Sequence, residues 1–312
     1  MRRLGLTAVT LSIILSAGPE FAQEQSTPAP SLTPSGAASL PDLTPDANGK
    51  LSQKQMQDLR QIVMEHYRSN YQKQRDYTYI VRKVENKLDG EGAIKSSESK
   101  IYEVMELYGE QIEREIAKDD QPLSEKDAAK EEKRIDKLTG ERKNESEGDR
   151  TKRQAEEEKQ REKNREFVRE VADAYDFRLL GSETLNGRDA WVIGGEPRPG
   201  FQAHLKEARI LPKYHGRLWI DKKELQLVKL DVEAIDTVSF GWVLARIYKG
   251  TRLVIEQTRV NEEVWLPQRV SFRFDARVAL FKSYNEEDED TFRDYKKFRA
   301  TTKIVSVGDV KP

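Results

Sequence analysis

The stretch that decides the fold of this chain is residues 216–235, which read GRLWIDKKELQLVKLDVEAI. Its second half alternates: Val228, Leu230 and Val232 are apolar, whereas the residues between them are charged. A period of two places these apolar side chains on one face of a β-strand and the charged ones on the other. Lys222-Lys223 forms the turn to the preceding strand. The stretch therefore predicts a hairpin of an antiparallel sheet with one dry and one wet face.

Strand patterns continue on both sides of this hairpin, with turn residues between them. Asn186-Gly187 is a strong hairpin signal, and Asn261-Glu262 marks another turn. We expect an antiparallel meander of about ten strands. The predicted strands are Tyr77–Leu88, Ser97–Tyr108, Gln111–Ala117, Phe177–Gly181, Ala190–Gly194, Gly216–Asp221, Leu225–Ile235, Thr251–Val260, Val264–Asp275, Arg277–Tyr284 and Phe292–Ile304.

A helix is predicted before the first strand, from Ser52 to Gln74. Apolar residues recur there at steps of three and four, which gives one apolar stripe along the helix. The Ser52 side chain can cap the first turn. We therefore expect this helix to pack on the sheet.

Residues 124–170 differ in kind from the rest of the chain. Acidic and basic residues occur there in equal numbers and leave very few apolar ones. Because helix formers predominate, we expect a charged and largely solvated helical insertion, broken into two arms at Gly140, Asn144 and Gly148. Its end has an apolar stripe that needs a surface: Phe167, Val171 and Tyr175.

The N-terminal residues predict export to the periplasm. Arg2 and Arg3 precede an apolar run, Leu4–Ala17, that is too short to span a bilayer, so residues 1–22 are interpreted as a signal peptide. Residues 23–50 are rich in Pro, Ser and Thr and predict a disordered linker. We expect the rest, 51–312, to form a single domain, with no transmembrane segment in the mature chain.

Composition argues against several classes of protein. The chain has no cysteine, which excludes disulfides, catalytic thiols and lipidation through cysteine. A net charge of -1 argues against binding to nucleic acid. The three histidines, His66, His204 and His215, do not have the spacing of metal ligands. The sequence predicts no metal, no cofactor and no catalytic residue, and therefore a protein that is not an enzyme.

A dense acidic run follows the predicted strand Arg277–Tyr284. It reads Glu286-Glu287-Asp288-Glu289-Asp290, but it lacks the glycine and the distal glutamate of an EF-hand calcium loop. We interpret it as a solvated loop between two strands.

Large apolar side chains are the remaining candidates for a binding site. Phe240 and Trp242 lie in an apolar stretch with no clear period, and Trp219, Leu230 and Phe272 occupy predicted strand positions. Ordinary core packing explains such residues, but a sheet that curls around an apolar ligand would also place them inside. These five residues are the predicted ligand-binding residues of an apolar cavity.

The order of elements resembles that of the outer-membrane lipoprotein-sorting proteins and their periplasmic relatives. The residues that suggest it are Gly216–Asp221, then Leu227–Glu233, and Val264-Trp265-Leu266-Pro267 at the start of a later strand. The resemblance implies an α+β fold: an open antiparallel β half-barrel covered by helices, here with a long charged helical insertion. It also implies an apolar space between sheet and helices that takes lipid or lipoprotein acyl chains. No individual ligand contact of the family can be matched by motif.

Two functions remain open on the sequence. The first is a periplasmic carrier or sensor that holds an apolar moiety, such as a lipoprotein acyl chain, in the half-barrel. The second is a structural or protein-interaction module with a filled core, which docks an envelope protein partner through the charged helical hairpin. An enzyme would need a convergent cluster of polar residues within a cleft.

Overall fold

The structure is a computed structural model that describes residues 43–47, 50–108, 110–240, 245–278 and 282–298. The predicted signal peptide and most of the predicted linker lie outside these residues. The chain divides into two compact units. The first unit contains Met1–Arg68 and Ser146–Leu227, and the second contains Ser69–Glu145 and Val228–Pro312.

In the first unit, helices pack on one face of a short antiparallel sheet. The core contains Leu59 of the first helix, Ile193 of the sheet and Ala174 at the end of the last helix. The two predicted apolar stripes meet here, because Met56 and Phe167 both pack against this core. Strand β6 is paired with β5 and β7. The elements are α2 (Gln53–Gln74) as far as Arg68, α4 (Glu147–Ala174), β5 (Tyr175–Leu185), β6 (Arg188–Pro197), the 3-10 helix η1 (Glu207–Lys213) and β7 (Tyr214–Asp221).

Asp221, at the end of β7, fixes the turn that follows. Its side chain is buried, and its Oδ1 accepts the backbone N–H groups of Lys223 and Glu224, at 3.0 and 2.7 Å. Arg188, which begins β6, donates to both carboxylate oxygens of Asp221, at 2.7 and 3.0 Å. An aspartate is favoured at this position because it bonds its own following backbone and a cation together.

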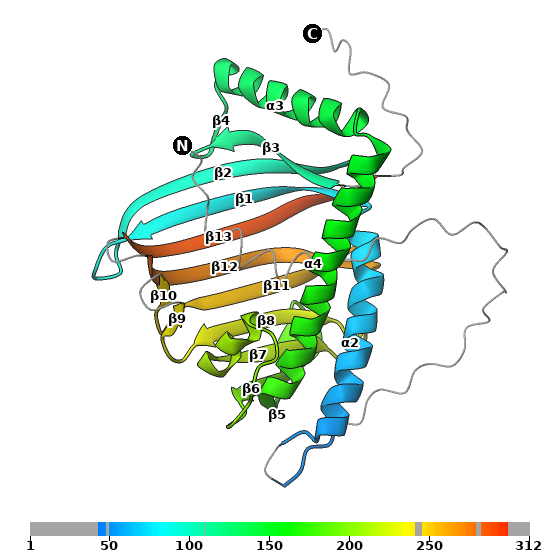
Figure 1. The fold of residues 1–312 in the computed structure, drawn as a ribbon, viewed down its shortest axis with the longest axis vertical. Helices are drawn as coiled ribbons and strands as arrows, with labels where there is room; N and C mark the ends of the chain where they lie inside the picture. The colour runs from blue at the N-terminus through cyan, green and yellow to red at the C-terminus, as the bar shows by residue number, and fades with distance from the viewer. Residues whose placement is uncertain (1–42, 48–49, 109, 241–244, 279–281, 299–312) are drawn as a thin grey trace, which may run out of the picture. The chain divides into compact units, whose positions relative to one another are not determined.

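In the second unit the strands form a long antiparallel run in the order β4-β3-β2-β1-β13-β12-β11-β8 (Figure 1). Strand β10 pairs with β12 and with β9 beside this run. The bounds are β1 (Tyr77–Leu88), β2 (Ile94–Leu107), β3 (Glu110–Lys118), β4 (Gln121–Pro122), β8 (Leu227–Ala234), β9 (Val238–Phe240), β10 (Ala245–Ile247), β11 (Arg252–Val260), β12 (Val264–Val278) and β13 (Lys282–Lys297), with helix α3 (Glu125–Lys143).

The predicted fold class, α+β with an open antiparallel sheet and helices, is confirmed. Among the described residues, β4 and β5 stand at the two ends of the strand order and do not pair with each other: β4 pairs with β3, and β5 pairs with β6 and forms one isolated bridge to Lys50, so the sheet is not closed. The predicted turns at Asn186-Gly187 and Asn261-Glu262 are present. Asn186 and Gly187 have φ of 50° and 76°, and Asn261 and Glu262 have φ of 50° and 55°, as the tight turns of hairpins require.

The interpretation of the acidic run 286–290 as a solvated loop is wrong. These residues form the centre of β13, and the predicted strands Arg277–Tyr284 and Phe292–Ile304 have to be replaced by the longer β12 and β13. The acidic residues are tolerated because the neighbouring strands supply basic partners: Glu287 lies opposite Arg273, and Glu286 lies opposite Lys87. Cross-strand pairs of opposite charge stabilise a sheet.

The charged insertion forms two helices, α3 and α4, as predicted, and the break between them lies at Asn144–Ser146 rather than at Gly140 or Gly148. Helix α3 continues through Gly140, and Gly148 lies in the first turn of α4. Ser124 and Ser146 cap the two helices by accepting backbone N–H groups. Helix α3 has no buried residue, which agrees with the solvated helix expected for this segment.

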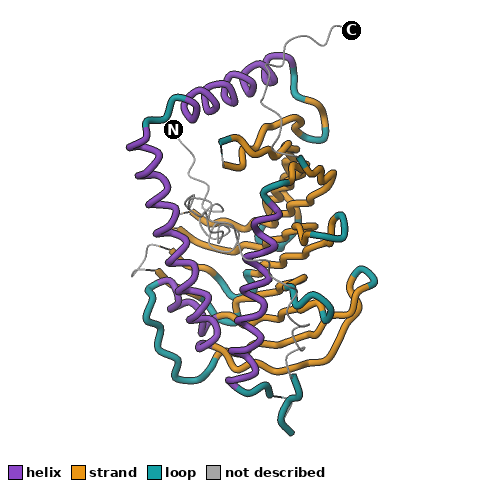
Figure 2. The backbone as a smooth tube through the Cα atoms, turned by 90° about the vertical axis from the view of Figure 1, so that its right-hand side faces the viewer, coloured by secondary structure: helices purple, strands orange, loops and turns teal. Residues whose placement is uncertain are grey.

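Helix α3 covers the exposed edge of β3 in the second unit, as both views show (Figure 1 and Figure 2). The Glu131 carboxylate accepts the backbone N–H of Glu115 at 2.8 Å, and the Arg134 guanidinium donates to the carbonyl oxygen of Glu113. These are two backbone groups that an added strand would bond. Because α3 bonds these groups, another chain cannot pair with β3 through them.

Asn70, near the end of α2, ties that helix end to the start of β12. Its side chain is 5% exposed, donates to the carbonyl oxygen of Trp265 at 2.8 Å, and accepts the Trp265 N–H at 2.7 Å. Gln74, one turn later, donates to the same carbonyl oxygen at 2.7 Å. The amide side chain of Asn70 thus satisfies both backbone groups of a buried strand residue.

We predict that Asn70→Ala lowers the free energy of unfolding by about 2–4 kcal/mol, because the buried N–H of Trp265 loses its acceptor and its carbonyl loses one donor. The matched control is Ser69→Ala, an exposed neighbour on the same helix, which should change stability by less than about 0.5 kcal/mol. Urea unfolding followed by circular dichroism measures both. Equal unfolding midpoints for the two variants would contradict the role given to Asn70.

Candidate functional site

One face of the second unit's sheet is charged and held by ion pairs between strands. Lys229 of β8 contacts Glu256 of β11 at 2.9 Å, and Arg252 of β11 contacts Asp231 of β8 at 2.5 Å. Arg269 of β12 contacts Glu289 of β13 at 2.5 Å. These pairs occupy the wet face predicted from the alternation of residues 228–233.

The other face of the same strands is apolar. Leu230 lies opposite Ile255, which lies opposite Val270, and Val232, Leu253 and Phe272 form the next row. Directly opposed residues of antiparallel strands point to the same side of a sheet, so these rows form one surface. We call it the apolar face: Leu230, Val232, Leu253, Ile255, Val270, Phe272 and Phe274.

The apolar face is only partly covered. Val270 and Phe274 are 3% and 6% exposed, whereas the other five residues are half-buried. Phe272 stacks on Phe274 with ring centroids 5.3 Å apart. The face thus has two buried side chains and five half-buried ones. An apolar ligand that packs on the half-buried side chains would complete their burial.

Two carboxyl groups border the apolar face on β13. Asp288 lies between Phe272 of β12 and Glu85 of β1, and Asp290 lies between Val270 of β12 and Lys83 of β1. Register therefore places both aspartates on the apolar side of the sheet, although neither is fully buried. Asp288 Oδ1 has no hydrogen-bond partner within the described part of the chain.

Burial raises the pKa of Asp288 to about 7 and the pKa of Asp290 to about 6. For Asp288 the loss of solvent is the largest cause, and the negative charges of Glu85, Glu286 and Asp290 add to it. For Asp290 the loss of solvent again comes first, and the nearby Lys83 partly opposes it. Near neutral pH these two groups therefore change charge.

Lys83 lies opposite Asp290 on β1, but other groups already engage it. Its Nζ contacts Glu113 of β3 at 2.7 Å and lies 5.1 Å from the centre of the Tyr102 ring. A lysine that is bonded to another carboxylate neutralises Asp290 only through space. The β13 border of the apolar face thus has an excess of acidic groups.

The structure places the five predicted site residues differently. Leu230 and Phe272 share the apolar face, on β8 and β12. Trp219 is buried in the first unit, where its indole N–H donates to Glu183 at 2.7 Å. Its neighbours Leu218 and Ile220 belong to the core under the helices, so Trp219 points to the opposite side of β7. Phe240 ends β9, but its side chain, like the whole of Trp242, lies outside the described residues.

The sequence reasoning missed Asp288 and Asp290 as members of this face. A signal was present, because Tyr284 and Phe292 frame the acidic run at even positions and mark a strand phase that includes both aspartates. The charge density of the run concealed this phase. Period-two patterns are easily hidden when polar residues occupy the inward positions.

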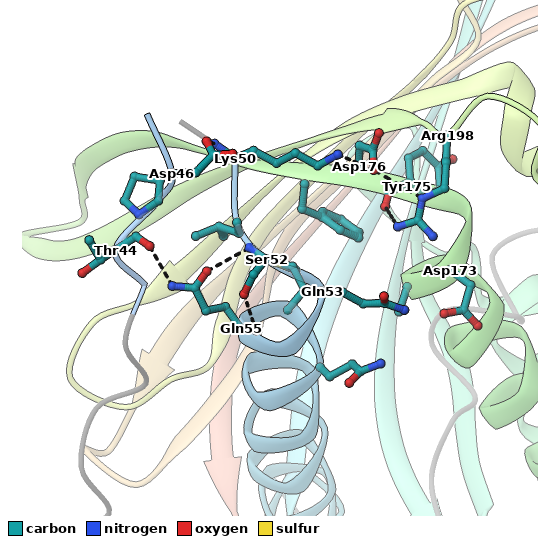
Figure 3. Close-up of a pocket in the computed structure, with 16 residues that line it drawn as sticks. Thr44, Asp46, Lys50, Ser52, Gln53, Gln55, Asp173, Tyr175, Asp176 and Arg198 are labelled. Atoms are coloured by element: carbon teal, nitrogen blue, oxygen red, sulfur yellow. Dashed lines mark hydrogen bonds and ion pairs between the residues drawn. The ribbon is translucent and has the colours of Figure 1, made fainter. Parts of the chain in front are cut away.

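A pocket of about 550 Å³ in the first unit, at the start of α2, is the other candidate (Figure 3). Lys50 and Arg198 both contact Asp176, at 3.0 and 3.3 Å. Ser52 and Gln55 bond each other's backbone N–H groups at 2.8 and 3.2 Å, which is a capping box. Because these polar side chains bond to one another, the apolar face of the second unit is the better candidate site.

Among the residues that the structure describes, no group of three or more His, Asp or Glu side chains is arranged to hold a metal ion. No helix within the described ranges is long and apolar enough to cross a membrane.

No family model matches the chain, and no curated protein matches it. Solved structures do match. A domain described as an outer membrane lipoprotein-sorting protein from Vibrio parahaemolyticus is 11% identical, covers 80% of this chain and 95% of its own, and has a TM-score of 0.30. A DUF1329 family protein from Desulfovibrio piger is 10% identical, covers 79% and 95%, and has a TM-score of 0.25. A LolA superfamily protein from Nitrosomonas europaea is 10% identical, covers 72% and 86%, and has a TM-score of 0.27.

The first of these descriptions names the family that residues 216–221 and 227–233 resemble. The TM-scores of all three are 0.30 or lower.

We predict that Asp288→Asn raises the melting temperature near neutral pH. A carboxyl whose pKa is raised in the folded state binds its proton more tightly there than in the unfolded chain. Stability is therefore lost as pH rises from about 4, the unfolded value, through about 7, the folded value. Asparagine removes this loss, so the two proteins should melt alike at about pH 4 and diverge by about pH 8.

The matched control is Glu287→Gln, which removes one negative charge from the adjacent, exposed position on the charged face. Its melting temperature should follow the wild-type pH profile. Differential scanning fluorimetry across this range measures all three proteins, and a pH-independent offset for Asp288→Asn would refute the raised pKa.

Proposed function

We propose that this chain is a non-enzymatic periplasmic binding protein that holds an apolar moiety, such as the acyl chain of a lipoprotein, against the apolar face. The observation that supports it is the division of the sheet into an ion-paired face and an apolar face that is only half covered. A soluble protein rarely leaves a contiguous apolar surface uncovered unless the surface binds something.

The energetics of such a site require no covalent chemistry. Each methylene group of an acyl chain that leaves water stabilises the complex by about 0.8 kcal/mol. A ligand that completes the burial of Leu230, Leu253 and Phe272 gains the same kind of contribution from the protein side.

The periplasmic location is supported by the export pattern at the N-terminus, Arg2-Arg3 followed by the apolar run Leu4–Ala17. N-terminal sequencing of the protein from an envelope fraction tests it. We expect a first residue near Gly18 or Gln23, and an intact Met1 would contradict cleavage.

The arrangement of α3 favours a second candidate function, a protein-interaction module that docks an envelope partner through the charged helices. Helix α3 has no buried residue and contacts the β3 edge through Glu131 and Arg134. Deletion of residues 125–163 distinguishes the two functions. It should leave binding of an apolar probe intact if the apolar face is the site.

We predict that wild-type protein binds the neutral apolar dye Nile red saturably and that Leu230→Glu weakens this binding at least tenfold. A glutamate at this position places a charge on the apolar face, where contact with the dye would remove its water. The measurement is a fluorescence titration, with circular dichroism to confirm that each variant is folded.

The matched control is Val254→Glu. Val254 precedes Ile255 on β11, and it lies on the charged face, opposite Asp231. It introduces the same charge at a half-buried aliphatic position and should leave dye affinity within about twofold of wild type. If Val254→Glu weakens binding as much as Leu230→Glu, the dye does not bind at the apolar face. Absence of saturable binding to wild type would overturn the proposed function.

A further inference from the structure

Asp288 is the unusual residue of the proposed binding face. Within the described residues, its Oδ1 is the one buried side-chain oxygen or nitrogen that has no hydrogen-bond partner. Buried polar atoms are nearly always bonded, because leaving one unbonded costs the full free energy of removing it from water. The residue as a whole is partly exposed, although this oxygen is buried.

The residues beside Asp288 on its own strand and opposite it on β1 are acidic. Glu286 and Asp290 lie two positions away on β13, and Glu85 lies directly opposite on β1. On β12 the opposite residue is Phe272, which has no charge.

The cations of the same side are already paired. Lys87 of β1 lies 3.9 Å from Glu85 and is exposed, and Lys83 of β1 bonds to Glu113 of β3. Among the described residues, neither Asp288 nor Asp290 therefore has a cation within ion-pair distance, and on β12 the residues opposite them are the apolar Phe272 and Val270.

We infer that the apolar face binds an amphiphile with a cationic head group, with a primary ammonium placed against Asp288 and Asp290 and the apolar chain running over Phe272, Leu253 and Leu230. This inference rests on the proposed function, because it assigns the ligand class of the same face. An ammonium group supplies both the hydrogen-bond donors that Asp288 Oδ1 lacks and the positive charge that the border lacks.

The same charges disfavour a free fatty acid. A carboxylate head group at this border would meet Asp288, Asp290 and Glu286, and like charges held close together in a partly desolvated site repel strongly. A neutral alcohol of equal chain length would avoid repulsion but would gain no ion pair. The predicted order of affinity is alkylamine, then alcohol, then carboxylate.

Titration of the aspartates makes this preference depend on pH. Their raised pKa values mean that both are substantially protonated at about pH 5.5, and a neutral carboxyl attracts an ammonium group only weakly. An alkylammonium itself stays charged over this range, as a lysine does. Affinity for the amine should therefore rise with pH through about 6 to 7, and affinity for the alcohol should stay constant.

The experiment is isothermal titration calorimetry of the full-length mature protein with dodecylamine, dodecanol and dodecanoate, below their critical micelle concentrations. At about pH 8 we expect dodecylamine to bind about tenfold or more tightly than dodecanol, a ratio typical of one charge-assisted hydrogen bond. This ratio should fall toward one at about pH 5.5.

Two variants locate the effect. Asp288→Asn keeps the shape of the side chain and should abolish most of the preference for the amine over dodecanol. Glu287→Gln removes the adjacent charge on the other face and should retain the preference. Equal affinity of wild type for amine and alcohol at about pH 8 would overturn the inference and leave the proposed function standing. If none of the three ligands binds, both proposals fail.

Discussion

Strand alternation in an antiparallel sheet is the constraint on which the rest of this structure depends. Along β8, β11 and β12, every second side chain enters the charged face, where Lys229–Glu256 and Arg252–Asp231 join neighbouring strands. The side chains of the residues between them therefore point to the other side of the sheet and form the apolar face. Because the period is two, a shift of one residue in register would exchange the faces and expose every apolar side chain. The cross-strand ion pairs and the apolar rows thus favour the same register.

Strand alternation also determines which face of the sheet the two aspartates of β13 occupy. Asp288 and Asp290 face the apolar side because Glu287 and Glu289 occupy the charged side, and Glu289 bonds to Arg269 there. Loss of water then raises both pKa values toward neutrality. A strand with acidic residues on both faces destabilises the sheet where it is buried, and such positions are commonly associated with function. In the proposed site, the positive charge of an ammonium group would offset the negative charges of Asp288 and Asp290.

Helix ends and sheet edges are completed by side chains rather than by further backbone. Asn70 bonds both backbone groups of Trp265, and Glu131 and Arg134 of α3 bond the outer groups of β3. In both cases a polar side chain satisfies backbone atoms that would otherwise be left unbonded or open to another chain. Helix α3 therefore protects the edge of the sheet although it adds nothing to a buried core.

The sequence by itself determined the features that depend on neighbouring residues. Alternation predicted β8 and its two faces, Asn186-Gly187 predicted a hairpin turn, and helix formers with equal charge predicted the insertion, because strand phase, turn geometry and helix propensity are local properties. Only the tertiary structure decided where the acidic run 286–290 lies. Its burial depends on pairing with β1 and β12, and β1 comes from the opposite end of the described chain. Asn70 and Trp265 meet for the same reason: no local pattern encodes which distant strand a residue will face, and burial and pKa follow from that pairing.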